Sequence, residues 1–332
     1  MGGNDAGQRA ERYLRKYFPH LSLDRLHSLF RRKEIKVSKR PIQRSHLLAS
    51  GDTLQVYGLK EAEAAGSGPG DGGGGPSESG SHPGAAGERA LPFDIPVLFE
   101  DADLLVLNKP PHMAVHPGTG IRSGESLIER VWVRAGSAPM ENELFRPSLV
   151  HRLDKETSGV ILVAKSGPCL RRLTAVLRAG GMVKKYLALV EGAPHPPEGL
   201  ITGALQRVDS RTGGAKAEVT DGEGKWAVTR YRTLKDLGKF SLLSVIIETG
   251  RMHQIRAHLA HAGHPLVGDS RYGSREGNRE IRKTLGLKRT FLHASDLEVD
   301  MGLGKKAVFH SPLPRDLASV LGRLGDSPAS AP

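Results

Sequence analysis

A single acidic residue, Asp154, lies in a short basic stretch near the middle of the chain. The stretch reads HRLDKETSG, so that Arg152 and Lys155 flank the acid and a turn-forming Thr-Ser-Gly follows it. Apolar residues precede and follow the stretch, which predicts a loop between two strands. An ionised carboxylate in such a loop is either half of a structural ion pair or a nucleophile or base held ready to react. Charge pattern alone favours the structural interpretation, because ion-pair networks are common.

The composition indicates what kind of protein positions this acid. With 332 residues and a formal net charge of +12, the chain has room for one sizeable domain and a small one, and its charge favours an anionic polymer as partner. The one cysteine, Cys169, excludes an internal disulfide framework, and its apolar neighbours predict a buried position in a helix. The first residues lack an apolar signal core, and no apolar stretch approaches the ~20 residues that span a bilayer. We therefore expect a soluble, cytoplasmic protein without a membrane segment.

Three parts follow one another along the chain. Residues 59–90 are dominated by Gly, Ser, Ala and Pro, and we expect a disordered linker there because such a segment cannot bury enough apolar surface to order itself. A small head, residues 8–58, precedes this linker, and a large body, residues 91–325, follows it. In the body, strand-like runs outnumber helical ones and are irregularly spaced, which argues against a doubly wound parallel sheet.

Apolar periodicity predicts the main elements of both parts. The head should contain a helix over 10–18, a second helix over 23–30 capped by Ser22, and strands over 35–37 and 53–56. The body should contain strands over 97–99, 104–107, 160–164, 186–190 and 242–247, and helices over 168–179 and 253–262. No glycine-rich phosphate fingerprint follows a strand, so we expect no nucleotide cofactor.

Four histidines crowd the segment 253–264, and two of them, His258 and His261, are three residues apart on a predicted helix. A zinc site would need three or four ligands of defined geometry. No cysteine or ligand-spaced carboxylate accompanies these histidines, and Arg251 and Arg256 lie among them. We therefore expect no metal site here, and expect structural hydrogen bonds or contacts with a phosphate backbone instead.

Sequence blocks on both sides of HRLDKETSG resemble, in their order, the RluA-type family of RNA pseudouridine synthases, in which this motif carries the essential Asp. The other blocks are Asn108-Lys109-Pro110 with Val115-His116-Pro117-Gly118, KYLALVEG at 185–192, TGRMHQIRAHL at 249–259, GHPLVGD at 263–269 and FLHA at 291–294. Met252 stands where Thr is usual, and Pro111-His112-Met113 is an unusual variant of the first block. Residues 181–186 and 271–276, with Arg279, are most similar to the RluC-type branch of the family.

The head resembles the S4 RNA-binding domain, because two helices lead to a hairpin and basic side chains cluster around the second helix. The resemblance implies RNA contacts for Arg25, Arg31, Arg32, Lys33 and Lys36. The alternative is that these charges form only a solvated helix face. The head departs from the S4 pattern at Ser38-Lys39-Arg40, where an Asn-Gly turn is more usual.

The family resemblance implies an α+β fold with a mixed, mostly antiparallel sheet, and isomerisation of uridines to pseudouridine in large-subunit ribosomal RNA. That reaction breaks the bond from ribose to N1 and forms a carbon–carbon bond at C5, with no metal and no cofactor. The catalytic residues would be Asp154, Tyr186 and Arg256, and the substrate-binding ones Arg152, Leu292, His151 and Thr157.

The resemblance also implies a role for each main side chain. Asp154 would be the nucleophile, and Arg256 would favour its ionised form and orient it through a bidentate pair. Tyr186 would stack on the target base or help remove its C5 proton. The uracil has to be extruded from the RNA, and Arg152 would fill the vacated space.

Each of these residues also has a plain structural interpretation. Tyr186 and Leu292 could be core side chains, Arg256 a solvent-facing helix residue, and Arg152 a phosphate contact. Two other functions are open to the chain as a whole: modification of uridines in transfer RNA, and a non-catalytic role in ribosome assembly. We expect a monomer that acts on ribosomal RNA or on an assembling subunit.

Overall fold

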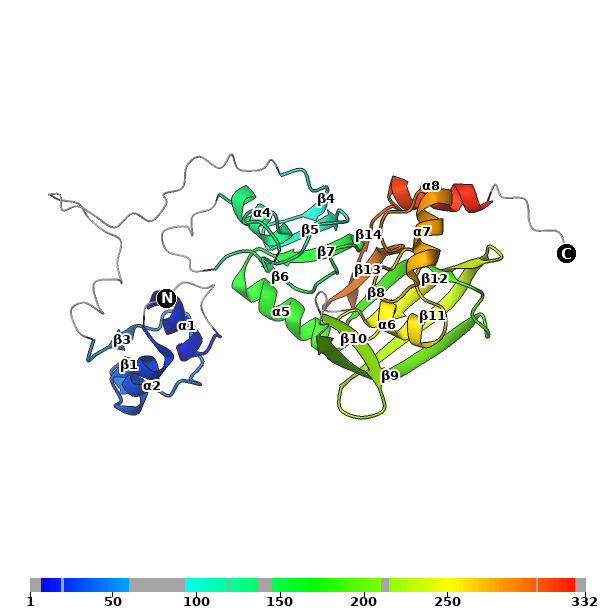
Figure 1. Cartoon of the computed structure of the whole chain (residues 1–332). Helices are drawn as coiled ribbons and strands as arrows, with labels where there is room; N and C mark the ends of the chain where they lie inside the picture. The colour runs from blue at the N-terminus through cyan, green and yellow to red at the C-terminus, as the bar shows by residue number, and fades with distance from the viewer. Residues whose placement is uncertain are drawn as a thin grey trace, which may run out of the picture. The chain divides into compact units, whose positions relative to one another are not determined.

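Figure 1 shows the computed structural model of the chain. The structure describes residues 7–18, 21–59, 93–118, 120–136, 145–209, 215–302 and 304–325. The expected linker lies outside these residues apart from Leu59, which packs against the core of the head. The chain divides into two compact units, one of which contains the head and the other most of the body. In the part of the chain that the structure describes, no helix is long and apolar enough to cross a membrane.

The head consists of two helices and a small antiparallel sheet, as the periodicity predicts. Its helices are α1 (Ala10–Tyr17) and α2 (Leu23–Arg31), and its strands are β1 (Ile35–Val37), β2 (Arg40–Pro41) and β3 (Leu54–Val56), in the order β2-β1-β3. The Ser22 side chain accepts a hydrogen bond from the backbone N–H of Arg25, which confirms the predicted cap of α2. Apolar side chains of both helices and of β1 form the core of this unit.

The turn between β1 and β2 forms without the usual Asn-Gly pair. Val37 pairs with Arg40, so Ser38 and Lys39 alone make the turn, with φ values of 49° and 67°. Positive φ at both central residues is the geometry of a type I′ turn, which matches the twist of the two strands. The hairpin therefore keeps its geometry even though neither residue is glycine.

The body is built on one 11-stranded sheet. Its strands are β4 (Val97–Glu100), β5 (Leu104–Lys109), β6 (Ser148–Leu149), β7 (Ser158–Ala164), β8 (Met182–Glu191), β9 (Glu198–Asp209), β10 (Ala215–Thr220), β11 (Lys225–Asp236), β12 (Phe240–Ile247), β13 (Leu292–Gly302) and β14 (Lys305–His310). The main order is β10-β9-β11-β12-β8-β13-β7-β5-β4, with β14 on β13 and β6 on β7. Only β13 and β7 run parallel among these described pairs, which confirms the mixed, mostly antiparallel sheet.

Helices cover both faces of this sheet near its centre. The body's helices are α4 (Leu127–Arg134), α5 (Gly167–Arg178), α6 (Gln254–His261), α7 (Arg275–Thr284) and α8 (Arg315–Gly325). Side chains alternate along β7: Ile161 and Val163 join the core that includes α4 and α6, whereas Leu162 joins the core that includes α5. Every residue of β7 is therefore buried, as expected for a strand covered on both faces. Cys169 lies buried in the α5 core, as predicted.

A close approach of two backbones fixes the start of β7, directly after the Asp154 loop. Gly159 pairs with Ala294 of the parallel strand β13 and has a φ of +119°. A Cβ atom at position 159 would lie 2.1 Å from the carbonyl oxygen of Ala294, closer than any two such atoms can come. Only glycine fits here, so the last residue of the HRLDKETSG motif is required by the packing of β7 on β13.

Candidate active site

Asp154 lies in the loop between β6 and β7, and a buried lysine binds the backbone of this loop. The backbone N–H of Thr157 donates to the carbonyl of Asp154 at 3.1 Å and closes the turn. The Lys109 ammonium, at the end of β5, has no exposed surface and donates to the carbonyls of Pro110, Met113 and Lys155 at 2.8, 2.8 and 3.1 Å. Burial lowers the pKa of Lys109 to about 7; Arg289 acts in the same direction, while Asp154 and Glu156 oppose it.

A buried arginine in the segment just before β13 also binds this loop. The Arg289 side chain is 1% exposed and donates to the carbonyl of Glu156 at 3.1 Å and to the hydroxyl of Ser158 at 3.2 Å. Its Nε also pairs with Asp316 of α8 at 2.7 Å. We call Lys109 and Arg289 the loop platform. Two cations thus bind successive carbonyls directly after Asp154, which fixes the backbone that carries the acid.

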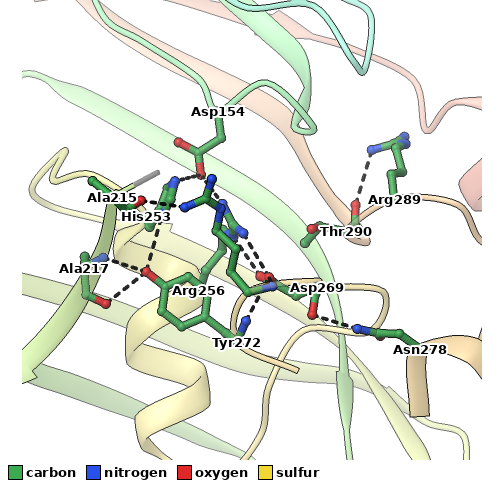
Figure 2. Close-up of polar contacts among 11 residues, drawn as sticks. Asp154, Ala215, Ala217, His253, Arg256, Asp269, Tyr272, Asn278, Arg289 and Thr290 are labelled. Atoms are coloured by element: carbon green, nitrogen blue, oxygen red, sulfur yellow. Dashed lines mark hydrogen bonds and ion pairs between the residues drawn. The ribbon is translucent and has the colours of Figure 1, made fainter. Parts of the chain in front are cut away.

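Arg256 of α6 reaches Asp154 while a second acid holds it in place (Figure 2). Its Nε and Nη2 donate to the two carboxylate oxygens of Asp269 at 2.7 and 2.9 Å, and its Nη1 donates to Asp154 at 3.3 Å. The expectation of a bidentate pair with Asp154 is therefore wrong: Asp269, which is fully buried, takes the fork of the guanidinium. Burial alone would raise the pKa of Asp269, but the bonds from Arg256 outweigh it and hold this pKa below its usual value.

Two ring side chains complete the support of Arg256. The guanidinium carbon lies 5.2 Å from the centre of the Tyr272 ring, and the Tyr272 hydroxyl bonds the backbone of Ala217 on β10 (Figure 2). His253 meets the Tyr272 hydroxyl at 3.2 Å through Nδ1, while its Nε2 lies 3.9 Å from Asp154. Burial lowers the pKa of His253 to about 4, so near neutral pH this ring adds no charge and Arg256 is the cation against Asp154.

The candidate catalytic residues open onto one small cavity of about 50 Å³. The side chains that line it and that the sequence singled out are Arg152, Asp154, Thr157, Tyr186, Arg256 and Leu292. Tyr186 and Leu292 are 5% and 3% exposed and belong to the core, so each is both a packing residue and a wall of this cavity. Asp154 keeps 18% of its side chain exposed, whereas Arg256 keeps 8%. The carboxylate of Asp154 thus faces a cavity that has one aromatic and one apolar wall, Tyr186 and Leu292, and Arg256 is held next to it by Asp269.

Comparison with known proteins decides the family of this chain. Residues 103–261 match the family model described as RNA pseudouridylate synthase. The ribosomal large subunit pseudouridine synthase C of Salmonella typhi is 34% identical over 323 residues, which cover 97% of this chain and 94% of that protein. The chain belongs to the RluA-type family of RNA pseudouridine synthases.

Two further comparisons agree with this assignment. The ribosomal large subunit pseudouridine synthase D of Zymomonas mobilis is 37% identical over 230 residues, which cover 68% of this chain and 72% of that protein. The solved structure of human RNA pseudouridylate synthase domain containing 4 covers 69% of this chain and 92% of its own, with a TM-score of 0.55 and 25% identity. The body of this synthase therefore has the fold that the sequence motifs predict.

His151 is the one predicted substrate contact that does not line the cavity of Asp154. Its Nε2 accepts a hydrogen bond from the backbone N–H of Leu162 at 3.2 Å, and it lines a neighbouring cavity instead. Burial, followed by the charge of Lys184, lowers the pKa of His151 to about 3. A neutral ring bonded to β7 anchors the first residue of the motif, so the geometry gives His151 a structural contact and leaves Arg152 beside the target site.

The crowded histidines of 253–264 take part in separate hydrogen bonds. His258 meets the hydroxyl of Thr229 at 3.0 Å and His264 meets the carbonyl of Glu191 at 3.0 Å, both through Nδ1, while His253 contacts Tyr272. His261 is exposed at the end of α6. These side chains point to four different surroundings, and three of them have structural partners of the kind that the sequence favours.

The basic residues of the head differ in what they contact. Arg31, Arg32 and Lys33 are exposed at the end of α2. Arg25 donates to the carbonyl of Gly58 at 2.7 Å, and the Lys36 ammonium lies 4.8 Å from the centre of the Tyr57 ring. The first three are thus available to an external partner, whereas Arg25 and Lys36 also hold the end of the head against its core.

Sequence reasoning gave no role to several residues that build the site: Lys109, Asp269, Tyr272 and Arg289. Lys109 and Asp269 lie in the family blocks, and a charged residue at the end of an otherwise apolar run, as in β5, is a signal for a buried and partnered group. Arg289 lies just before the FLHA block, outside every block that the sequence singled out. The partners of these groups follow only from the fold.

Proposed function

We propose that this synthase isomerises uridines to pseudouridine in large-subunit ribosomal RNA, with Asp154 as the nucleophile. One observation carries the proposal: the carboxylate of Asp154 faces a cavity walled by Tyr186 and Leu292, with the fixed guanidinium of Arg256 at 3.3 Å. A carboxylate so placed is oriented and shielded from bulk water on one side, which is what attack at the sugar or base of a uridine needs. The relatives named for large-subunit ribosomal RNA support the substrate.

The reaction balances within the uridine itself. The bond from C1′ to N1 breaks, the uracil turns in the cavity, and C1′ bonds to C5. The proton on C5 is lost and N1 gains one, so the product has the atoms of the substrate and no redox step or group donor is involved. Asp154 bonds to C1′ as N1 leaves and is displaced when C5 bonds to C1′, which restores the carboxylate, and Arg256 keeps that carboxylate oriented.

The burial of Tyr186 separates the two roles that the sequence leaves open for it. Burial, followed by the charge of Asp154, raises the pKa of the Tyr186 phenol well above its usual value. The phenol therefore stays protonated near neutral pH and is not available to accept the C5 proton. We assign it the role of an aromatic surface on which the target uracil stacks, with Leu292 as the apolar wall beside it.

The RNA has to release its base before this chemistry can start. Extrusion of a stacked base costs a few kcal/mol, which a side chain that fills the vacated space offsets in part. Arg152 is exposed two residues before Asp154 and lines the same cavity, so we assign it this role. In the head, an S4-like unit, Arg31, Arg32 and Lys33 would add phosphate contacts that raise affinity without reading sequence. The enzyme would act as a monomer in the cytoplasm.

The test is complementation of cells that lack this gene, with mapping of pseudouridines in ribosomal and transfer RNA. The wild-type gene should restore pseudouridines in large-subunit ribosomal RNA, and Asp154→Asn should restore none, because it removes the ionised oxygen but little volume. Asp236→Asn, at an exposed hairpin, is the matched control and should behave as wild type. Activity of the Asp154→Asn enzyme would disprove the nucleophile. Modification of transfer RNA alone would overturn the assignment of ribosomal RNA as substrate. If the cells that lack the gene lose no pseudouridine in either RNA, the result would favour a non-catalytic assembly protein.

A further inference from the structure

A second cavity adjoins the candidate active site in the body and is rich in positive charge. It measures about 400 Å³, within the range of small-molecule sites. It shares Arg152, Tyr186 and Arg251 with the cavity of Asp154, and Arg178 and Lys184 extend it away from that site. We call this space the basic cavity. The acid in its wall, Glu248, already pairs with Arg230 at 2.9 Å, so its charge is directed to a cation outside the cavity.

Lys184 is the unusual member of the basic cavity, because it is buried and has no partner. Only 7% of it is exposed, and no hydrogen bond or ion pair reaches its ammonium from any residue that the structure describes. Burial, followed by the charge of Arg251, lowers the pKa of Lys184. A buried cation without a partner is costly to the fold. Such a group persists where an anion from outside the chain completes it.

The surroundings of Lys184 leave room for that anion. A Cβ atom added at Gly250 would lie 3.5 Å from the Lys184 Nζ, an ordinary contact distance, so position 250 lies beside the ammonium and presents no side chain to it. The Nε of Arg251 donates to the carbonyl of Trp226 at 3.2 Å, which holds the guanidinium at the rim. The ammonium thus faces a turn without a side chain, next to a tethered second cation.

The register of β8 relates this cation to the target base. Lys184 and Tyr186 are two residues apart on one strand, so their side chains leave the same face roughly 7 Å apart. Both are buried, whereas Lys185 between them points to the other face and lines a different cavity. A nucleotide whose base stacks on Tyr186 therefore has its backbone within reach of the Lys184 ammonium.

We propose that the basic cavity is a phosphate site, in which the Lys184 ammonium binds a phosphodiester of the RNA next to the target uridine. The proposal rests on the proposed function, because it places the target base at Tyr186. The phosphate supplies the negative charge that no described residue places next to the Lys184 ammonium. Binding of the RNA backbone then fixes the strand from which the base is extruded.

The test compares Lys184→Met with Lys185→Met, its neighbour on the opposite face of β8. Both changes are made in the Asp154→Asn protein so that no turnover occurs, and the probe is an unmodified transcript of large-subunit ribosomal RNA. Lys184→Met should weaken binding about tenfold, as expected for one charge-assisted hydrogen bond. It should also reduce the slope of log affinity against log salt by about 0.7 to 1, the contribution of one phosphate. Lys185→Met should change the affinity less than twofold.

Stability without RNA separates a phosphate site from a structural lysine. Because the Lys184 ammonium has no hydrogen-bond or ion-pair partner among the residues that the structure describes, Lys184→Met should unfold at an equal or higher urea concentration than the parent protein. A structural lysine would instead give a lower unfolding midpoint with unchanged RNA affinity, and that result would overturn the proposal. Unchanged RNA affinity, with a melting temperature that inorganic phosphate raises in the parent but not in Lys184→Met, would show a site for free anions and would also overturn it.

The outcomes of this test and of the complementation test are independent. Binding in the Asp154→Asn protein does not depend on catalysis. A large effect of Lys184→Met in a chain that forms no pseudouridine would leave the phosphate site in place and remove the catalytic proposal. Wild-type binding by Lys184→Met in a chain that does form pseudouridine would remove only the phosphate site.

Discussion

Two buried lysines on the same sheet have opposite surroundings. Lys109, at the end of β5, is fully buried and donates to three backbone carbonyls. Lys184, on β8, is 7% exposed and has no hydrogen-bond or ion-pair partner among the described residues. Burial lowers the pKa of both ammonium groups. Each lysine therefore has a desolvation cost, and the two differ in the contacts that offset it.

The difference indicates which buried charges serve the fold and which serve a ligand. The carbonyls around Lys109 belong to the loop of Asp154 and to the turn after β5, so the folded chain itself compensates that charge. No part of the described chain compensates Lys184, and its cavity opens beside the reacting centre. Hydrogen-bond partners, rather than burial, thus distinguish the loop platform from the proposed phosphate site.

The largest expected effect is the loss of stability in Lys109→Met. Methionine keeps most of the volume but leaves the carbonyls of Pro110, Met113 and Lys155 without their donor, at a cost of about 3 kcal/mol or more. Urea unfolding measures this loss, and Lys184→Met is the matched control that should lose nothing. The Asp154 loop should also move, so the rate of pseudouridine formation should fall. Equal stability of the two variants would contradict the distinction between the lysines.

Acid should act through histidines rather than lysines, with a smaller effect for each group. Burial lowers the pKa of His151 to about 3 and that of His253 to about 4, so between pH 6.5 and about 4 only the unfolded chain takes up these protons. Stability should therefore be unaffected by these groups above pH 6.5 and fall as the pH drops below it. At pH 5 the loss is on the order of 2 kcal/mol for each histidine.

The lysine variants sharpen this pH prediction. Lys184 lowers the pKa of His151, so Lys184→Met should raise that pKa and end the acid loss from His151 at a higher pH. Lys109 does not contribute to the pKa of either histidine, so Lys109→Met should shift the whole stability curve without changing its acid slope. Urea unfolding at several pH values and NMR titration of His151 measure both effects. An identical His151 pKa in wild type and Lys184→Met would contradict an interaction between the two groups.

The fold was predictable where strands are apolar throughout and not where they alternate. The runs at 104–107, 160–164, 186–190 and 242–247 fall inside β5, β7, β8 and β12, which are buried in the centre of the sheet. The strands β9 and β11 were missed although each has 12 residues. They have one half-exposed face, so charged side chains such as Arg230 and Arg232 interrupt the apolar pattern. Helix α7 was missed for a similar reason, since its only buried residue is Ile281.

The candidate site was predictable as a set of residues but not as an arrangement. Asp154 and Arg256 follow from motifs, yet the motifs cannot show that Asp269 takes the bidentate position. The contacts that build the loop platform join residues 46 and 133 positions apart, and Arg256 lies 102 positions from Asp154. Contacts over such distances depend on the sheet order, which local patterns in one sequence do not contain.

The smallest expected effect concerns the exposed end of the loop platform, the pair of Arg289 and Asp316. Asp316 is 48% exposed, and an ion pair with so exposed an acid contributes little, so Asp316→Asn should cost less than about 1 kcal/mol and leave the rate near that of wild type. Arg289 would still donate to the carbonyl of Glu156 and to Ser158. Arg289→Met removes those bonds as well and should cost two to three times more, because a buried carbonyl loses its donor. Urea unfolding and single-turnover rates of the two variants compare the contributions. An equal loss in both would mean that the exposed carboxylate orients Arg289, and that the loop of Asp154 depends on α8 rather than on the carbonyl bonds beneath it.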